Sequence, residues 1–250
     1  MIELDKIYND DCMNILRSLP DESVDLCVSD PPYLVTARGN AGNSGGMLKK
    51  DIYNSGKVFE HNDIDIEEYL PELYRVLKDG SHCYLMCNHV NLVHFLKVID
   101  ESKFHFIKCL VWENLNKIMG TFYMNCFEYI LFMRKGRAVP INDCGCGDIL
   151  SFPNVKTKRN GENIHDSQKP VALMQVLIKN SSQRGDIVLD PFIGSGTTAI
   201  AAYKTGRHYI GCEISEKYYN VAIERFNKEC LGISKTKSGK TVIEQTLFDI

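Results

Sequence analysis

Short apolar runs alternate with amphipathic stretches along most of this 250-residue chain, and this alternation limits the fold more than any other feature. Each apolar run predicts a buried strand, and each stretch with apolar residues at helical spacing predicts a helix. The expected strands are 6–8, 24–28, 82–87, 104–112, 128–133, 186–189 and 208–212, and the expected helices are 12–19, 65–78, 91–100, 171–178, 197–204 and 216–229. This alternation predicts the α/β class, with a mostly parallel sheet that helices cover on both faces.

Three segments break the pattern. Residues 36–62 are rich in Gly, Asn and Ser, and their length and position after a buried strand predict a mobile loop over a site. Residues 136–164 lose the periodicity again and carry Gly, Pro, Asn and basic residues. Residues 231–250 predict a loosely held tail, in which 241–248 can form one edge strand.

Composition narrows the class of protein. The 29 basic and 32 acidic side chains give a net charge of −3, which argues against a general nucleic-acid coat protein. No apolar run approaches the length of a membrane span, and the first residues show no signal peptide. The ten scattered cysteines therefore predict reduced thiols in a cytoplasmic protein, and the Cys144–Cys146 pair lacks the spacing of a metal site.

A short polar motif follows the apolar run 24–28. Asp30, Pro31, Pro32 and Tyr33 stand at the carboxyl end of the expected strand, where open α/β sheets bind ligands. The prolines fix the backbone, so the Asp30 carboxylate and the Pro31 carbonyl form two fixed acceptors beside an aromatic ring. This arrangement suits a planar group with an NH2, such as a nucleobase amine. The alternative is an ordinary turn with a solvated aspartate.

A second motif is predicted to form a strand, a glycine turn and a helix over residues 187–198. Gly194 and Gly196 allow a ligand to approach the backbone closely, and Glu213, one strand later, can accept both hydroxyls of a ribose. Together with Ala199 the glycines also fit the dinucleotide pattern, so a nicotinamide cofactor stays open. The Asp190 carboxylate before the turn suits a cationic amino-acid group, and the hydroxyls of Thr197 and Thr198 after it suit a polar group. These residues favour S-adenosylmethionine.

Together, the two motifs and the residues 165–170 resemble the amino-methyltransferases of DNA, which act on adenine N6 or cytosine N4. Residues 30–33 match the catalytic tetrapeptide of that family, residues 190–198 match its cofactor loop, and Glu213 matches its ribose acid. The catalytic motif precedes the cofactor motif, which is the beta-group order. Glu128 falls on a family acid that either holds backbone or has a functional role.

The resemblance implies a Rossmann-like, S-adenosylmethionine-dependent methyltransferase fold with a seven-stranded, mostly parallel sheet in circularly rearranged order. Residues 1–135 would form the catalytic half, 136–164 a short target-recognition segment, and 165–230 the cofactor half. The implied cofactor-binding residues are Asp11, Cys12, Asp30, His165, Ser167, Lys169, Asp190, Phe192, Gly194, Ser195, Gly196, Thr197, Thr198, Glu213 and Ile214. The candidate DNA-binding residues are Lys49, Lys50, Arg137, Lys156, Lys158 and Arg159.

The activity implied by the resemblance is methyl transfer from S-adenosylmethionine to N6 of adenine in double-stranded DNA, after the base is flipped out. Asp at position 30 leans toward adenine, and cytosine N4 is the first alternative. A nicotinamide oxidoreductase and a catalytically silent DNA-binding protein are the alternatives from other classes. A homodimer and a partner restriction endonuclease are expected, in the cytoplasm of a bacterium or archaeon or encoded by a phage.

Overall fold

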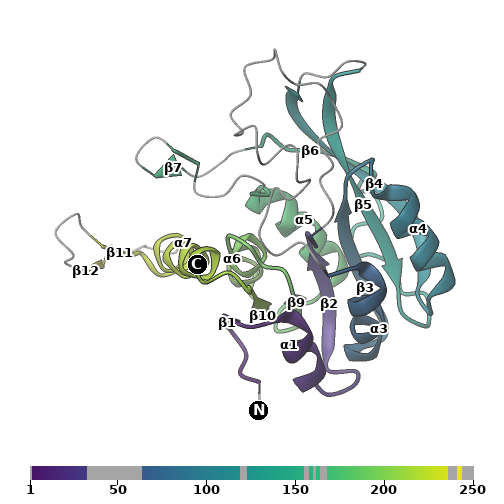
Figure 1. Ribbon diagram of the computed structural model, residues 1–250, viewed down its shortest axis with the longest axis horizontal. Coiled ribbons are helices and arrows are strands. Elements are labelled where there is room, and N and C mark those ends of the chain that lie inside the picture. Colours follow the sequence, from purple (N-terminus) through teal and green to yellow (C-terminus); the bar gives the residue numbers. More distant parts are fainter. Residues whose placement is uncertain are drawn as a thin grey trace.

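The computed structural model describes residues 2–32, 64–118, 123–154, 158–159, 162–163, 168–235 and 241–243. Its main sheet has eight strands in the order β1-β10-β9-β2-β3-β5-β4-β6 (Figure 1). These strands are β1 (Lys6–Tyr8), β2 (Val24–Ser29), β3 (Leu77–Cys87), β4 (His105–Ile118), β5 (Asn125–Arg134), β6 (Ile149–Ser151), β9 (Ile187–Asp190) and β10 (His208–Cys212). The described helices are α1 (Cys12–Ser18), α3 (Ile66–Val76), α4 (Leu92–Glu101), α5 (Val171–Ser181), α6 (Thr197–Lys204) and α7 (Glu216–Leu231).

Strand directions confirm the expected sheet and add one strand. From β1 to β3 all neighbours are parallel, and β5 runs antiparallel to both β3 and β4. This is the mostly parallel sheet with one antiparallel strand, extended by the short edge strand β6, which pairs parallel with β4. The sequence did not predict β6, because only its central residue, Leu150, is buried and so short a strand leaves no periodic signal.

The helices form two layers, one on each face of the sheet. Side chains of α1, α3 and α4 enter one hydrophobic cluster, and those of α5, α6 and α7 enter the other. Strand β2 supplies both clusters, with Cys27 on one face and Leu26 and Val28 on the other. Burial on both faces explains why the central strands appear in the sequence as continuous apolar runs.

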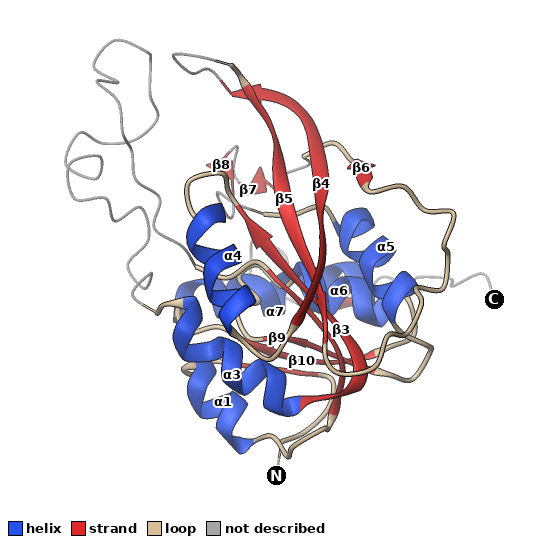
Figure 2. Cartoon of the chain, turned by 90° about the vertical axis from the view of Figure 1, so that its right-hand side faces the viewer, coloured by secondary structure: helices blue, strands red, loops and turns tan. Residues whose placement is uncertain are grey.

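Several predicted boundaries were wrong. Helix α3 ends at Val76 and not at 78, because Leu77 already pairs with Val24 as the first residue of β3. Strands β4 and β5 extend beyond the predicted 104–112 and 128–133, and form a ribbon that projects past the rest of the sheet (Figure 2). The ribbon was missed because its outer residues, such as Leu115, are exposed and follow no regular apolar pattern.

The remaining described segments are short. Residues of the predicted tail form β11 (Ile233–Lys235) and β12 (Thr241–Ile243), which pair with each other in a separate antiparallel hairpin and not at the edge of the main sheet. Strands β7 (Lys158–Arg159) and β8 (Glu162–Asn163) form a second hairpin. The predicted mobile loop 36–62 lies outside the described residues. Within the described part, no helix has the length and apolar character needed to cross a bilayer.

The topology determines where a ligand can bind. The chain passes from β9 through α6 to β10 on one side, and from β2 through α3 to β3 on the other. Strands β9 and β2 are neighbours, so the direction of winding reverses between them. In open α/β sheets the crevice at the carboxyl ends of such strands is the ligand site.

Candidate active site

The acidic motif and the glycine turn meet at this crevice. Cys27 on β2 pairs with Leu189 on β9, so the two strands end side by side. The Ser29 hydroxyl donates a hydrogen bond of 2.6 Å to Oδ1 of Asp190. Asp30 is the next residue, and it therefore lies beside the turn predicted to hold a cofactor.

Glycine is required at one position of that turn for two reasons. Gly196 has φ +82°, in the left-handed region that side chains disfavour. A Cβ atom built there would lie 3.1 Å from Cβ and 3.2 Å from Cα of Ala222 on α7. The missing side chain therefore lets α6 begin at Thr197 while α7 packs directly against the turn.

A buried arginine that sequence reasoning missed stabilises the same turn. Arg225 of α7 is 4% exposed, and its Nη1 donates to the Ser195 carbonyl at 2.7 Å and to the Ser195 hydroxyl at 2.9 Å. The same nitrogen lies 3.2 Å from Oγ1 of Thr197, and Nε pairs with Glu229 at 3.1 Å. In the sequence this residue resembles any other charged residue of an amphipathic helix, so no local pattern indicates its role.

The predicted ribose acid lies next to the turn. Glu213 follows β10, and its Oε2 accepts a hydrogen bond of 3.1 Å from the Gly194 amide. Oε1 accepts from the Ser215 amide at 2.8 Å, so backbone donors orient both carboxylate oxygens. Ile214 follows at the edge and is 47% exposed.

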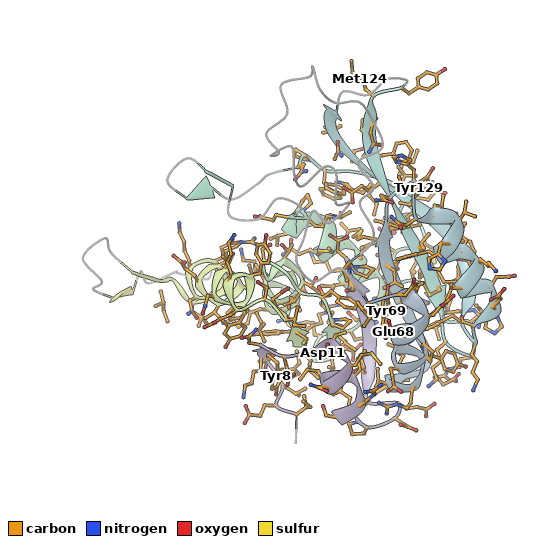
Figure 3. All side chains as sticks on the ribbon, in the orientation of Figure 1. Tyr8, Asp11, Glu68, Tyr69, Met124 and Tyr129 are labelled. Atoms are coloured by element: carbon orange, nitrogen blue, oxygen red, sulfur yellow. The ribbon has the colours of Figure 1, made fainter. Side chains whose placement is uncertain are left out.

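Asp11 and Cys12 lie at the end of the neighbouring strand β1. The Glu213 amide donates to the Tyr8 carbonyl at 2.9 Å, which joins the ends of β1 and β10. Asp11 is the N-cap of α1 (Figure 3). Its side chain accepts a hydrogen bond of 2.8 Å from the Met13 amide. Cys12 is 5% exposed. The structure thus brings Asp11, Cys12, Glu213, the glycine turn and Asp30 to one edge of the sheet.

Asp190 is a buried carboxylate within this edge. It is 3% exposed, and burial raises its pKa from an ordinary value of 3.8 to about 6. Hydrogen bonds from Ser29, Thr198 and the Phe192 amide oppose that rise, while the nearby charge of Asp30 adds to it. At neutral pH the group is mostly ionised, and it offers a negative charge in a poorly hydrated place.

Lys169 makes contacts that the sequence did not predict. Its Nζ lies 2.6 Å from Oδ2 of Asp30 and 3.1 Å from Oε2 of Glu128. Its side chain is 4% exposed. The position just before α5 brings this lysine to the acidic motif from a distant part of the chain.

The other predicted residues are described only in part. Tyr33, Lys49, Lys50, Lys156, His165 and Ser167 lie outside the described residues, and only the backbone of Lys158 and Arg159 is described, in β7. Arg137 lies at the opposite edge of the sheet, with its Nε 3.4 Å from Oδ2 of Asp79 near the start of β3. It follows β5, and the antiparallel direction of β5 carries the chain away from the candidate site. The prediction that Arg137 helps the site to hold DNA is therefore not supported by its position.

The α/β fold of this chain is the fold of DNA methyltransferases of known structure. The M1.HpyAVI–SAM complex aligns with a TM-score of 0.64 at 23% identity, covering 88% of this chain and 98% of that one. The cytosine-N4-specific PvuII DNA methyltransferase aligns with a TM-score of 0.70 at 19% identity, covering 88% and 86%. These similarities confirm the fold predicted from the sequence.

The family follows from the sequence match. The model of the N6/N4 DNA methylase family matches residues 24–224, and the chain belongs to this DNA methylase family. The type II methyltransferase M2.MboI of Moraxella bovis is 27% identical over 244 residues, covering 89% of this chain and 87% of the relative. M.HinfI of Haemophilus influenzae, also a type II methyltransferase, is 28% identical over 248 residues, covering 90% and 69%.

The cofactor of the family fits the residues of this edge. DNA methylases of this family use S-adenosylmethionine, as the sequence predicted, and DNA is the substrate. Backbone amides orient the Glu213 carboxylate on the flank of the glycine turn, and the buried Asp190 offers a second carboxylate at the start of that turn. Membership of this family also sets aside the nicotinamide oxidoreductase.

Proposed function

We propose that this protein transfers a methyl group from S-adenosylmethionine to the exocyclic N6 of adenine at a specific DNA sequence. The observation that carries the proposal is the Asp30 carboxylate, held at the end of β2 directly beside the cofactor turn. The resemblance of residues 30–33 to the catalytic tetrapeptide, with aspartate in first place, supports adenine as the base.

The residues of the motif have distinct tasks in this proposal. The lone pair of N6 is delocalised into the adenine ring, so the free amine is a poor nucleophile. Asp30 and the Pro31 carbonyl accept hydrogen bonds from the amine, which raises electron density on nitrogen as it becomes tetrahedral. Tyr33 stacks on the base once it has left the duplex, since the amine cannot reach the cofactor from within the stack.

The cofactor supplies the electrophilic methyl group, and the protein supplies placement and fixed charges. In our proposal Glu213 accepts the ribose hydroxyls, Asp190 faces the cationic amino-acid end, and Asp11 accepts from the adenine amine of the cofactor. Of the remaining predicted cofactor residues, those that the structure describes belong to the glycine turn, to the starts of α1 and α6, or to the residues after β2 and β10 and before α5.

Product analysis tests the choice of base. Mixed-sequence DNA is incubated with protein and cofactor, digested to nucleosides and analysed by mass spectrometry, with a reaction lacking cofactor as the control. We expect N6-methyladenine. N4-methylcytosine would establish the second candidate, which the family also includes. DNA binding without either product would indicate the catalytically silent protein.

Removing the Glu213 carboxylate should weaken cofactor binding. The Glu213→Ala variant loses a pair of charge-assisted hydrogen bonds to the ribose, with an expected cost of about 1–3 kcal/mol. Isothermal titration calorimetry with S-adenosylmethionine measures the change. Glu216→Ala is the matched control, because Glu216 begins α7 only three positions later and has no predicted contact with the cofactor. Equal affinities for Glu213→Ala and the wild type would remove Glu213 from the site.

Cofactor affinity should also depend on pH through Asp190. A cationic ligand binds the ionised carboxylate better, so affinity should fall as the pH drops through about 6, by up to about tenfold for each pH unit. The raised pKa has the opposite consequence for folding. The folded chain retains a proton that the unfolded chain loses, so the free energy of unfolding falls as pH rises from about 4 to about 6.

Calorimetry between pH 5 and 8 tests the first effect, and chemical denaturation between about pH 4 and 7 tests the second. The Asp190→Asn variant cannot ionise at this position, and its cofactor affinity should be lower and nearly independent of pH. A wild-type affinity that stays constant across pH 6 would contradict the assignment of Asp190 to the cationic end of the cofactor.

Two partner predictions belong to the proposal. A second copy of the chain and a restriction endonuclease remain predictions, based on the resemblance and on the short target-recognition segment 136–164. Light scattering after size-exclusion chromatography measures the mass of the protein in solution and so tests for the second copy. Growth of cells that express the methylase with and without a candidate endonuclease measures the second, since methylated genomes resist cleavage.

A further inference from the structure

A lysine lies between two carboxylates at the catalytic edge. Asp30 follows β2, Glu128 belongs to β5, and Lys169 precedes α5, so the cluster joins three parts of the chain that are distant in sequence. The ammonium of Lys169 lies 2.6 Å from Asp30 and 3.1 Å from Glu128. At 4% exposure the lysine side chain is far less hydrated than either acid, at 20% and 23%.

The sheet register places Glu128 at this edge. Its neighbour Tyr129 pairs with Cys87, the last residue of β3, so Glu128 lies just beyond the end of that strand. Tyr129 lies at the base of the ribbon and Met124 at its far end (Figure 3). Across the strands Glu128 pairs with Trp112, whose indole ring centre is 5.8 Å from the Lys169 ammonium.

The indole itself is fixed. Trp112 is fully buried, and its Nε1 donates a hydrogen bond of 2.9 Å to the Phe152 carbonyl. The ammonium is therefore bounded by Asp30, by Glu128 and by an aromatic face that attracts a cation. These contacts leave the Lys169 head group little freedom, and they hold Oδ2 of Asp30 in one direction.

The charges of the cluster explain why a second acid is present. A lysine paired with Asp30 alone would neutralise the carboxylate that accepts the target amine. With Glu128 included, one cation faces two anions, and the cluster retains a charge of −1. During transfer the nitrogen lone pair forms the bond to the methyl carbon as the carbon–sulfur bond breaks toward sulfur, and the nitrogen then releases one proton to water. A net negative cluster stabilises the positive charge that develops on nitrogen.

We propose that Lys169 and Glu128 are positioning residues for Asp30. Lys169 orients the carboxylate, and Glu128 offsets the lysine charge so that Asp30 keeps its negative charge for the target amine. This inference rests on the proposed function, and it assigns Lys169 to the catalytic aspartate in place of the cofactor that the resemblance implied.

Single and double variants that change the net charge of the cluster test the inference through steady-state kinetics. Glu128→Gln keeps the size of the side chain and removes its charge, and we expect kcat to fall about 10- to 100-fold with the KM for cofactor unchanged. Glu128→Asp should restore part of the loss. Glu113→Gln is the matched control, because Glu113 lies on the adjoining strand and contacts Ser151 instead of Lys169.

The double variant separates charge from structure. Glu128→Gln with Lys169→Met removes one negative and one positive charge, which restores the net charge of −1, and its kcat should exceed that of Glu128→Gln alone. A double variant no faster than Glu128→Gln would overturn the inference, and so would wild-type kcat in Glu128→Gln. If the double variant had a raised KM for cofactor and an unchanged kcat, Lys169 would belong to the cofactor site, and this result would also overturn the inference.

Failure of the proposed function is distinguishable from failure of this inference. If the product is N4-methylcytosine, the proposed base is wrong, but the kinetics of the variants can still be measured with that product. Absence of transfer by the wild type would overturn both. Thermal unfolding of each variant shows whether a loss of kcat reflects a loss of folded protein, and Glu128→Asp provides the second measurement if Glu128→Gln does not fold.

Discussion

Asp30→Ala is expected to lower methyl transfer to DNA by about 1,000-fold or more, with cofactor affinity unchanged. The variant removes the fixed acceptor for the target amine, so the nitrogen keeps its delocalised lone pair. Cofactor affinity should persist because the glycine turn, Glu213 and Arg225 make their contacts with one another independently of this carboxylate. Transfer is measured with labelled cofactor, and affinity by calorimetry.

The same strand provides the control for Asp30. Asp25→Ala removes a carboxylate from β2 itself, where Asp25 contacts Lys78 at 2.5 Å and the Ile187 amide at 3.0 Å, away from the site. We expect this variant to lose stability and keep its kcat. If Asp30→Ala retained full transfer, the acceptor role of Asp30 would be wrong. If it lost transfer only together with cofactor affinity, Asp30 would belong to the cofactor site alone.

Gly196→Ala is expected to damage both the fold and the cofactor site. A side chain at φ +82° costs about 1–2 kcal/mol, and the contact with Ala222 raises the expected loss to about 2–4 kcal/mol in the free energy of unfolding. Because the backbone of α7 cannot retreat easily, the turn itself must shift, and cofactor affinity should weaken by about a hundredfold. Denaturant titration and calorimetry measure the two losses.

A second glycine separates backbone strain from contact. Gly185 has φ +87°, and a Cβ atom built on it would meet nothing within 4 Å. Gly185→Ala should therefore lower the free energy of unfolding by only the backbone strain of about 1–2 kcal/mol, and it should leave cofactor affinity unchanged. Equal effects of the two substitutions on both measurements would show that the packing of Gly196 against α7 has no role in the cofactor site.

Much of the fold was predictable because its signals are local. Buried strands with both faces covered are continuous apolar runs, and surface helices repeat their apolar residues at helical spacing. The expected elements from 6–8 to 216–229 all form, with errors at their ends. The two motifs were also predictable, since proline and glycine constrain the backbone wherever they occur, and the parallel sheet brings the ends of β2 and β9 together.

By itself the sequence determined the α/β class, the order of the two motifs and the residues at the ends of β1, β2, β9 and β10. Only the tertiary structure showed that Lys169 lies between Asp30 and Glu128, that Arg225 stabilises the Ser195 turn, and that Arg137 lies at the opposite edge of the sheet. These contacts depend on strand register, on the direction of β5 and on how α5 and α7 pack. Such features arise between residues far apart in the chain, where no local period or motif records them.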